Sequence, residues 1–295
     1  MGRDVFDGSA AARRVFETAD RVFDFSLTSL CFEGPEDALQ QTENAQPAIF
    51  TTSLACLEAA RELGGLPAEP PAFVAGHSLG EYTALVAAGA LALEDGLRLV
   101  RERGRLMQQA GDRNPGAMAA ILGLDEEPLA AICQEAGAEV CNLNAPGQIV
   151  IGGTERAVEG AMALALERGA SRGVRLKVSG AFHTSLMAPA AEGMRRAVAE
   201  TPLRDPDVPV IANTTGAPIA SAEELREELV LQLRQAVQWQ RSMEHMRDQG
   251  VGVVIEFGPG RVLTGLARRI DRKIAVRNVS DLAGARAQTA SPAPP

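Results

Sequence analysis

Residues that bind metals or form disulfides are scarce in this chain of 295 residues. It has three histidines and four cysteines, and no two cysteines form a Cys-x-x-Cys pair. Metal centres need clustered His, Cys or carboxylate ligands, and disulfide scaffolds need a much higher cysteine density. The sequence therefore predicts no metal and no disulfide scaffold, and its cysteine usage predicts a reducing compartment, the cytoplasm.

Positive charge and long apolar runs are also lacking. Lys and Arg number 29 against 38 Asp and Glu, which gives a net charge of -9. Because nucleic acids and anionic membranes attract basic surfaces, we expect neither as a partner. No stretch reaches the ~18 apolar residues of a membrane span, and the N-terminal residues lack the apolar core of a signal peptide.

What the sequence does contain is a mixture of helical and strand patterns. Apolar residues at three- and four-residue spacing predict helices over 11–23, 46–65, from about 79, and over 93–109, 222–235, 237–248 and 262–270. Short apolar runs predict strands at 72–75, 208–213, 251–257 and 273–279. This alternation predicts an α/β fold with a parallel sheet.

Residues 116–181 follow a different pattern, strand-helix-strand-strand-helix-strand, which predicts a small ferredoxin-like subdomain. Because the α/β pattern resumes after it, we expect this subdomain to be inserted in a discontinuous catalytic domain made of 1–115 and 182–281. Residues 282–295, rich in Pro, Ala and Ser, are expected to form a disordered tail.

The stretch Gly76-His-Ser78-Leu-Gly80 lies between a predicted strand and a predicted helix. This is the pattern of a nucleophile elbow, in which glycines allow a sharp turn that exposes the serine. The N–H of Leu79 would then face a developing oxyanion at the start of the helix. The alternative is a serine that only caps the helix, with glycines required for packing.

A serine nucleophile needs a base, and the chain offers His77, His183 and His245. His77 is adjacent to Ser78 and should point away from it, while His245 lies within a predicted surface helix. His183 follows a strand in an apolar loop, which favours it as the base over a purely structural histidine. No acidic residue has a clear claim to orient it, so a backbone carbonyl could do so in a Ser-His dyad.

Five motifs carry a specific resemblance: GHSLGEYTALVAAGAL, RGRLMQ, NLNAPGQIVIGG, SGAFHTSLM and EFGPGRVLTGL. In this order and spacing the sequence resembles the malonyl-CoA:acyl carrier protein transacylases, from Met1 to about Asp281. The resemblance implies an α/β-hydrolase-like large domain with an inserted ferredoxin-like (βαββαβ) subdomain.

The resemblance also implies residue roles. Ser78 would be the acylated nucleophile, His183 its base, and the backbone carbonyl of Gln232 the group that orients His183. Arg103 would bind the malonyl carboxylate, for which a guanidinium fork is suited. From the residues alone, the pattern favours a solvated helix arginine among Arg98, Arg101 and Arg105 over a substrate-binding one.

Three further positions match the substrate pocket of the family: Gln46, Asn144 and Phe182. Phe182, in the context Ala-Phe-His, is similar to family members that favour malonyl over bulkier acyl units. Taken alone, a Gln before proline and an Asn in a turn are commonplace.

The implied activity is transfer of malonyl from malonyl-CoA to the phosphopantetheine thiol of acyl carrier protein, through a malonyl-serine, in fatty-acid or polyketide synthesis. No bound cofactor or metal is implied, and we expect a monomer. The alternatives are a serine thioesterase or esterase, and an inactive truncated pseudoenzyme.

An acidic carrier protein would need a local basic face on this acidic chain. Two sets of basic residues are candidates, the first near the C-terminus and the second on the last strand of the small subdomain: Arg261, Arg268, Arg269, Arg272 and Lys273, and Arg172, Arg175 and Lys177.

One departure from the family pattern concerns the N-terminus. Family members begin with a strand and a Gly-Gln-Gly loop upstream of the residue that matches Met1, and that loop supplies a second oxyanion N–H. We therefore expect either that the coding sequence continues upstream of Met1 or that the chain as given is impaired.

Overall fold

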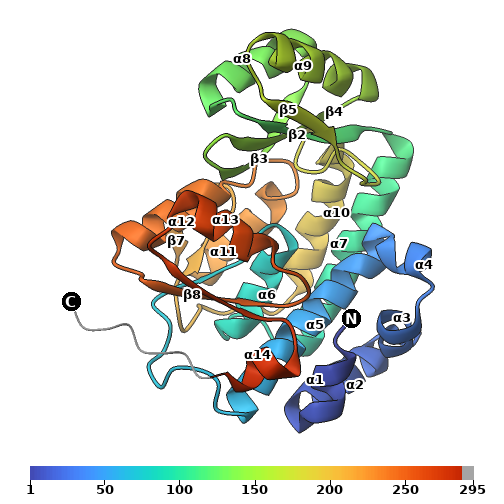
Figure 1. Ribbon diagram of the computed structural model, residues 1–295. Helices are drawn as coiled ribbons and strands as arrows, with labels where there is room; N and C mark the ends of the chain where they lie inside the picture. The colour runs from blue at the N-terminus through green and yellow to red at the C-terminus, as the bar shows by residue number, and fades with distance from the viewer. Residues whose placement is uncertain (288–295) are drawn as a thin grey trace.

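The structure is a computed structural model that describes residues 1–287. Figure 1 shows a small sheet, covered on one side by two helices, next to a larger body of helices around short strands. The mixed α/β class expected from the sequence is confirmed. Within residues 1–287, no helix has the length and apolar character needed to cross a bilayer.

Helices α5 (Thr42–Glu62) and α7 (Leu93–Arg113) pack against each other through the large body. Helix α5 buries apolar side chains on several faces, Phe50 and Leu54 among them, as expected of a helix surrounded by protein. The N-terminal helices that flank it are α1 (Arg3–Gly8), α2 (Ala10–Val22), α3 (Leu27–Glu33) and α4 (Glu36–Gln40).

Helix α5 begins one turn earlier than the sequence predicts, with Pro47 inside it. Proline has no N–H, so the carbonyl of Glu43, one turn earlier, loses its helical partner. The Arg101 guanidinium of α7 donates to this carbonyl over 2.7 Å. A tertiary hydrogen bond therefore satisfies the group that the local sequence leaves open.

The strands of the large body form two separate sheets. In one, β1 (Val74–Ala75) is parallel to β6 (Val210–Ile211), and β7 (Pro218–Ile219) is antiparallel to β6. In the other, β8 (Val253–Phe257) is parallel to β9 (Ala275–Val279). The expected parallel pairing is thus present, but β7 was not predicted and β1 and β6 are shorter than predicted.

The helices after the small sheet complete the large body: η1 (Ser185–Met187), α10 (Ala188–Glu200), α11 (Ala222–Leu231), α12 (Trp239–Asp248) and α13 (Val262–Ile270). Helix α11 ends before the predicted residue 235. The reason is that the next two carbonyls, of Gln232 and Leu233, accept hydrogen bonds from the side chain and main chain of His183.

The small unit contains the elements in the predicted order: β2 (Ala117–Leu122), α8 (Glu126–Ala136), β3 (Glu139–Ala145), β4 (Gln148–Gly153), α9 (Glu155–Glu167) and β5 (Arg172–Arg175). Its antiparallel strands lie in the order β3-β4-β2-β5. Ile121, Leu129, Ile132 and Ile151 are fully buried in a core of its own beneath α8 and α9.

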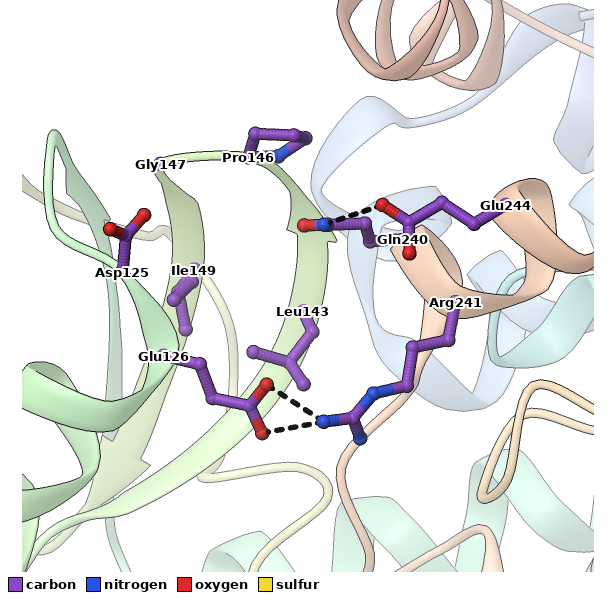
Figure 2. A pocket seen from close by; sticks show the side chains of 9 residues that line it. All are labelled: Asp125, Glu126, Leu143, Pro146, Gly147, Ile149, Gln240, Arg241 and Glu244. Carbon is purple, nitrogen blue, oxygen red and sulfur yellow. Dashed lines mark hydrogen bonds and ion pairs between the residues drawn. The ribbon is translucent and has the colours of Figure 1, made fainter.

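The small unit contacts the large body through main chain and side chains. The N–H of Leu143 in β3 donates to the carbonyl of Val237, whose N–H donates to Cys141. A cavity of about 230 Å³ lies at this junction. Figure 2 shows the side chains that line it and the two hydrogen bonds of Arg241 to Glu126. Both side chains of this ion pair are about half exposed, so it contributes little to stability.

The tail predicted from residue 282 is partly wrong, because residues 282–286 form helix α14 (Leu282–Arg286). Asp281 caps the helix by accepting from the N–H of Gly284, the N–H of Leu282 donates to Asp4, and Ala285 is fully buried. Residues 288–295 of the predicted tail lie outside the described part of the chain.

Ser78 occupies a strained turn between β1 and α6 (Leu79–Ala87), with φ 51° and ψ -103°. A Cβ added at Gly76 would lie 1.9 Å from the carbonyl carbon of Gly80, so only glycine fits there. A Cβ added at Gly80 itself would meet nothing within 4 Å. The first glycine of the motif is therefore required by packing, and the second is not.

This difference yields a prediction on stability. Gly76→Ala should lower the free energy of unfolding by at least about 2 kcal/mol, because the new methyl group must displace backbone. Gly80→Ala, the matched control, should leave it unchanged or raise it by up to about 1 kcal/mol, since alanine favours helix. Urea denaturation of both variants measures this, and equal stability of the two would contradict the packing argument.

Candidate active site

The structure brings Ser78 and His183 together from positions 105 residues apart in the sequence, with 2.8 Å between Ser78 Oγ and His183 Nε2. His183 lies in the segment between β5 and η1, also at positive φ (61°), and its side chain is buried. This is the pairing expected from the sequence.

The backbone carbonyl of Gln232 lies 2.6 Å from His183 Nδ1. Because a carbonyl only accepts, Nδ1 carries the proton and donates it, which leaves Nε2 free to accept from Ser78. Burial, together with the Arg103 cation nearby, lowers the pKa of His183 to about 3. The imidazole is therefore neutral at physiological pH, the form that a general base requires.

Arg103 of α7 is 1% exposed, so it is not the solvated helix arginine that the sequence alone also allowed. Its guanidinium donates to Ser78 Oγ over 2.9 Å, to Gln46 Oε1 over 2.6 Å and to Gln232 Oε1 over 2.7 Å. It also lies over the ring of Tyr82, 5.3 Å from the ring centre.

None of the ion pairs within residues 1–287 involves Arg103, and its Nε has no hydrogen-bond partner there. Burial accordingly lowers the pKa of Arg103, although an arginine keeps its charge. A buried cation beside Ser78 without a carboxylate partner among the described residues is suited to bind an anionic group.

Three of the other predicted residues, Gln46, Leu79 and Phe182, adjoin Arg103, Ser78 and His183. Gln46 is buried and holds Arg103. Leu79 is the first residue of α6, so its N–H has no carbonyl one helical turn earlier to donate to. Phe182 is half-buried beside His183 and packs against the apolar core.

Asn144 lies farther out, where its Oδ1 is 2.8 Å from His77 Nε2. His77 thus points away from Ser78, as expected, toward the end of β3 and the ring of Trp239. The third histidine, His245 of α12, packs against the ring of Phe73.

Two contributions to the site were not predicted. Asn213 accepts from the N–H of Ser78 over 2.6 Å and donates to the carbonyl of Gly76 over 2.7 Å. Its position directly after strand β6, the neighbour of β1, is a signal that could have identified it, since the carboxyl ends of parallel strands meet. The side chain of Gln232 also donates to the carbonyl of Ser78, in addition to its contact with Arg103.

The arrangement supports acyl transfer through a covalent serine intermediate. It combines a nucleophile on a strained turn, a neutral histidine oriented by a carbonyl, helix N–H groups and a buried cation. Among residues 1–287, no group of three or more His, Cys, Asp or Glu side chains is placed to hold a metal ion.

Comparison with known proteins agrees with this chemistry. The sequence matches the acyl transferase domain family over residues 1–287. The malonyl CoA-acyl carrier protein transacylase of Bacillus subtilis is 44% identical over 286 residues, which cover 95% of this chain and 89% of the relative. The protein of the same name from Escherichia coli K12 is 42% identical over 259 residues, or 86% and 83% of the two chains.

Solved structures give the same result. The malonyl CoA-acyl carrier protein transacylase of Coxiella burnetii has a TM-score of 0.92 at 35% identity, over 97% of this chain and 90% of that one. A malonyl-transacylase in complex with its type II PKS acyl-carrier protein has a TM-score of 0.92 at 38% identity, over 97% and 93%. The resemblance inferred from the five motifs is confirmed, and the chain belongs to the acyl transferase family, with the malonyl CoA-acyl carrier protein transacylases.

Proposed function

We propose that this protein transfers malonyl from malonyl-CoA to the phosphopantetheine thiol of an acyl carrier protein, in fatty-acid or polyketide synthesis. Relatives of that name at 44% and 42% identity support the reaction. The observation that carries it in this chain is Arg103, a buried cation 2.9 Å from Ser78 Oγ that has no ion pair with an acidic side chain within residues 1–287. Thioester hydrolysis by the same dyad would not require such a carboxylate site.

In the first half-reaction, Ser78 Oγ attacks the thioester carbonyl while His183 Nε2 takes its proton. The negative charge that develops on the carbonyl oxygen is stabilised by the N–H of Leu79 and the N-terminal end of α6. When the C–S bond breaks, CoA leaves as a thiol with the proton from His183, and malonyl remains as an ester on Ser78.

In the second half-reaction, His183 takes the proton of the phosphopantetheine thiol, and the sulfur attacks the malonyl ester. The C–O bond to Ser78 breaks and Oγ recovers the proton from His183. Arg103 binds the malonyl carboxylate throughout, while Gln46 holds the guanidinium in place. This cycle needs no bound cofactor or metal.

The carrier protein is the proposed macromolecular partner, as in the related complex with a type II PKS acyl-carrier protein. Of the two basic sets, Arg175 is paired with Glu155 and Glu159, which weakens the set on β5. Arg268 and Arg272, at the end of α13 and just beyond it, are exposed and favour the C-terminal set.

We further propose an α/β-hydrolase-like catalytic domain, residues 1–115 and 182–281, with the ferredoxin-like subdomain 116–181 inserted in it. The strand order β3-β4-β2-β5 and the separate core of the small unit support this division. The four free, buried cysteines support a reducing compartment, the cytoplasm. The monomeric state stays a prediction.

The nucleophile assignment predicts a covalent adduct. After incubation with malonyl-CoA, the intact protein should gain the mass of one malonyl group. Ser78→Ala should abolish this gain. The control Ser185→Ala, which changes an exposed serine of η1, should retain it. Intact-mass spectrometry measures the adduct, and a modified Ser78→Ala variant would refute the assignment.

The role of Arg103 predicts a change of specificity. Its charge-assisted pair with the malonyl carboxylate is worth about 1.5–3 kcal/mol, and acetyl makes no such pair. Arg103→Ala should therefore lower kcat/KM for malonyl-CoA roughly 10- to 100-fold more than for acetyl-CoA. Equal losses for the two substrates would mean that Arg103 only supports Ser78.

The proposed docking surface predicts a selective loss in the second half-reaction. Arg268→Glu combined with Arg272→Glu should slow transfer to carrier protein about tenfold at low salt and leave loading unchanged, because opposite charges speed association. Arg98→Glu with Arg195→Glu, exposed residues elsewhere, gives the same change in net charge as a control. Identical transfer rates for the two double variants would exclude the surface.

A further inference from the structure

Two acidic side chains, Glu81 of α6 and Glu228 of α11, are buried directly beneath the site, 1% and 4% exposed. They accept from the main-chain N–H groups of two successive residues, Asn213 and Thr214. Burial raises the pKa of both carboxyls, and for Glu81 the neighbouring Glu228 adds to the effect. Both carboxyls therefore favour the neutral form more than an exposed glutamate does.

Their remaining contacts differ. Glu228 accepts from the N–H and the hydroxyl of Thr214. Glu81 accepts from the N–H of Asn213 over 2.9 Å through Oε1, and from the side-chain amide of Gln232 over 2.8 Å through Oε2. Each carboxyl thus accepts one hydrogen bond on each of its two oxygens, but only Glu81 accepts from the side chain of Gln232.

The two residues that donate to Glu81, Asn213 and Gln232, also hydrogen-bond to the other residues of the site. Asn213 fixes the turn by its hydrogen bonds to the N–H of Ser78 and the carbonyl of Gly76. Gln232 binds the carbonyl of Ser78 and the guanidinium of Arg103 with its side chain, and His183 with its backbone carbonyl. Nucleophile, base and cation are therefore connected to one carboxylate through two intermediaries.

The orientation of the Gln232 amide is the sensitive point. Its Oε1 must face Arg103, which only donates, so its NH2 must face two acceptors, the carbonyl of Ser78 and the carboxylate of Glu81. If the amide turned over, its NH2 would oppose the guanidinium and displace it. The turned-over amide would also place its oxygen against Glu81 Oε2 and the carbonyl of Ser78, and both of these hydrogen bonds would be lost.

We propose that Glu81 is a positioning residue that fixes the Gln232 amide and thereby keeps Arg103 aimed at the substrate carboxylate. This inference rests on the proposed function, since it assigns how the carboxylate site of that reaction is held. Glu81 does not contact the substrate; it acts through Gln232.

The test compares two substitutions that each remove one buried carboxyl. In Glu81→Gln the new NH2 opposes the amide of Gln232, so kcat/KM for malonyl-CoA should fall about 10- to 100-fold more than for acetyl-CoA, mainly through a raised KM. In Glu228→Gln, the matched control, both acceptors of the Gln232 amide remain in place, so the malonyl-to-acetyl ratio should stay within about threefold of the wild type.

A second variant removes the intermediary. Gln232→Met lacks the amide but keeps the backbone carbonyl that orients His183, and should show the same selective loss of malonyl. The double variant Glu81→Gln with Gln232→Met should show the same malonyl-to-acetyl ratio of kcat/KM as Gln232→Met alone. If Glu81→Gln does not fold, as judged by thermal unfolding, Gln232→Met alone decides.

The outcomes distinguish a failure of the proposed function from a failure of the proposed role of Glu81. Wild-type protein that does not load malonyl would refute the proposed function itself. Wild-type protein that loads malonyl, with an unchanged malonyl-to-acetyl ratio in Glu81→Gln or in Gln232→Met, would overturn the role of Glu81.

Discussion

The constraint on which the site depends is the burial of one positive charge, Arg103, in the interior of the large body. Removing a guanidinium from water carries a large electrostatic penalty unless acceptors surround it. Two glutamine oxygens, the Ser78 hydroxyl and the Tyr82 ring provide that environment. The cation in turn helps to keep the neighbouring imidazole neutral. In the proposed reaction, one buried charge therefore serves both substrate binding and base chemistry.

The guanidinium and the groups that surround it come from several elements of the fold. Helix α7 supplies Arg103, α5 supplies Gln46, the turn before α6 supplies Ser78, and the residue after α11 supplies Gln232. Packing of α5 against α7 therefore does more than bury apolar surface, because it sets the distance between the guanidinium and its first acceptor. The packing of these two helices thus contributes to the stability of the fold and, in the proposed reaction, to the preference for malonyl.

The sequence predicted the parts of the site that have local signals. The Gly-x-Ser-x-Gly turn and the scarcity of histidines were sufficient to pair Ser78 with His183, and apolar periodicity was sufficient to identify the small four-stranded unit. It did not predict the hydrogen bonds of Asn213 or Glu81, whose partners lie 132–151 residues away and leave no periodic trace. Helix α14 and the start of α5 were missed for the same reason, since distant groups stabilise both.

The chain enters the small unit after α7 and returns to the large body through the segment that carries His183. Both anchors of that histidine, the carbonyls of Gln232 and Leu233, belong to the large body, whereas the small unit buries a core of its own. The outer surface of the small unit, on α8 and α9, can therefore change in sequence without separating His183 from Ser78.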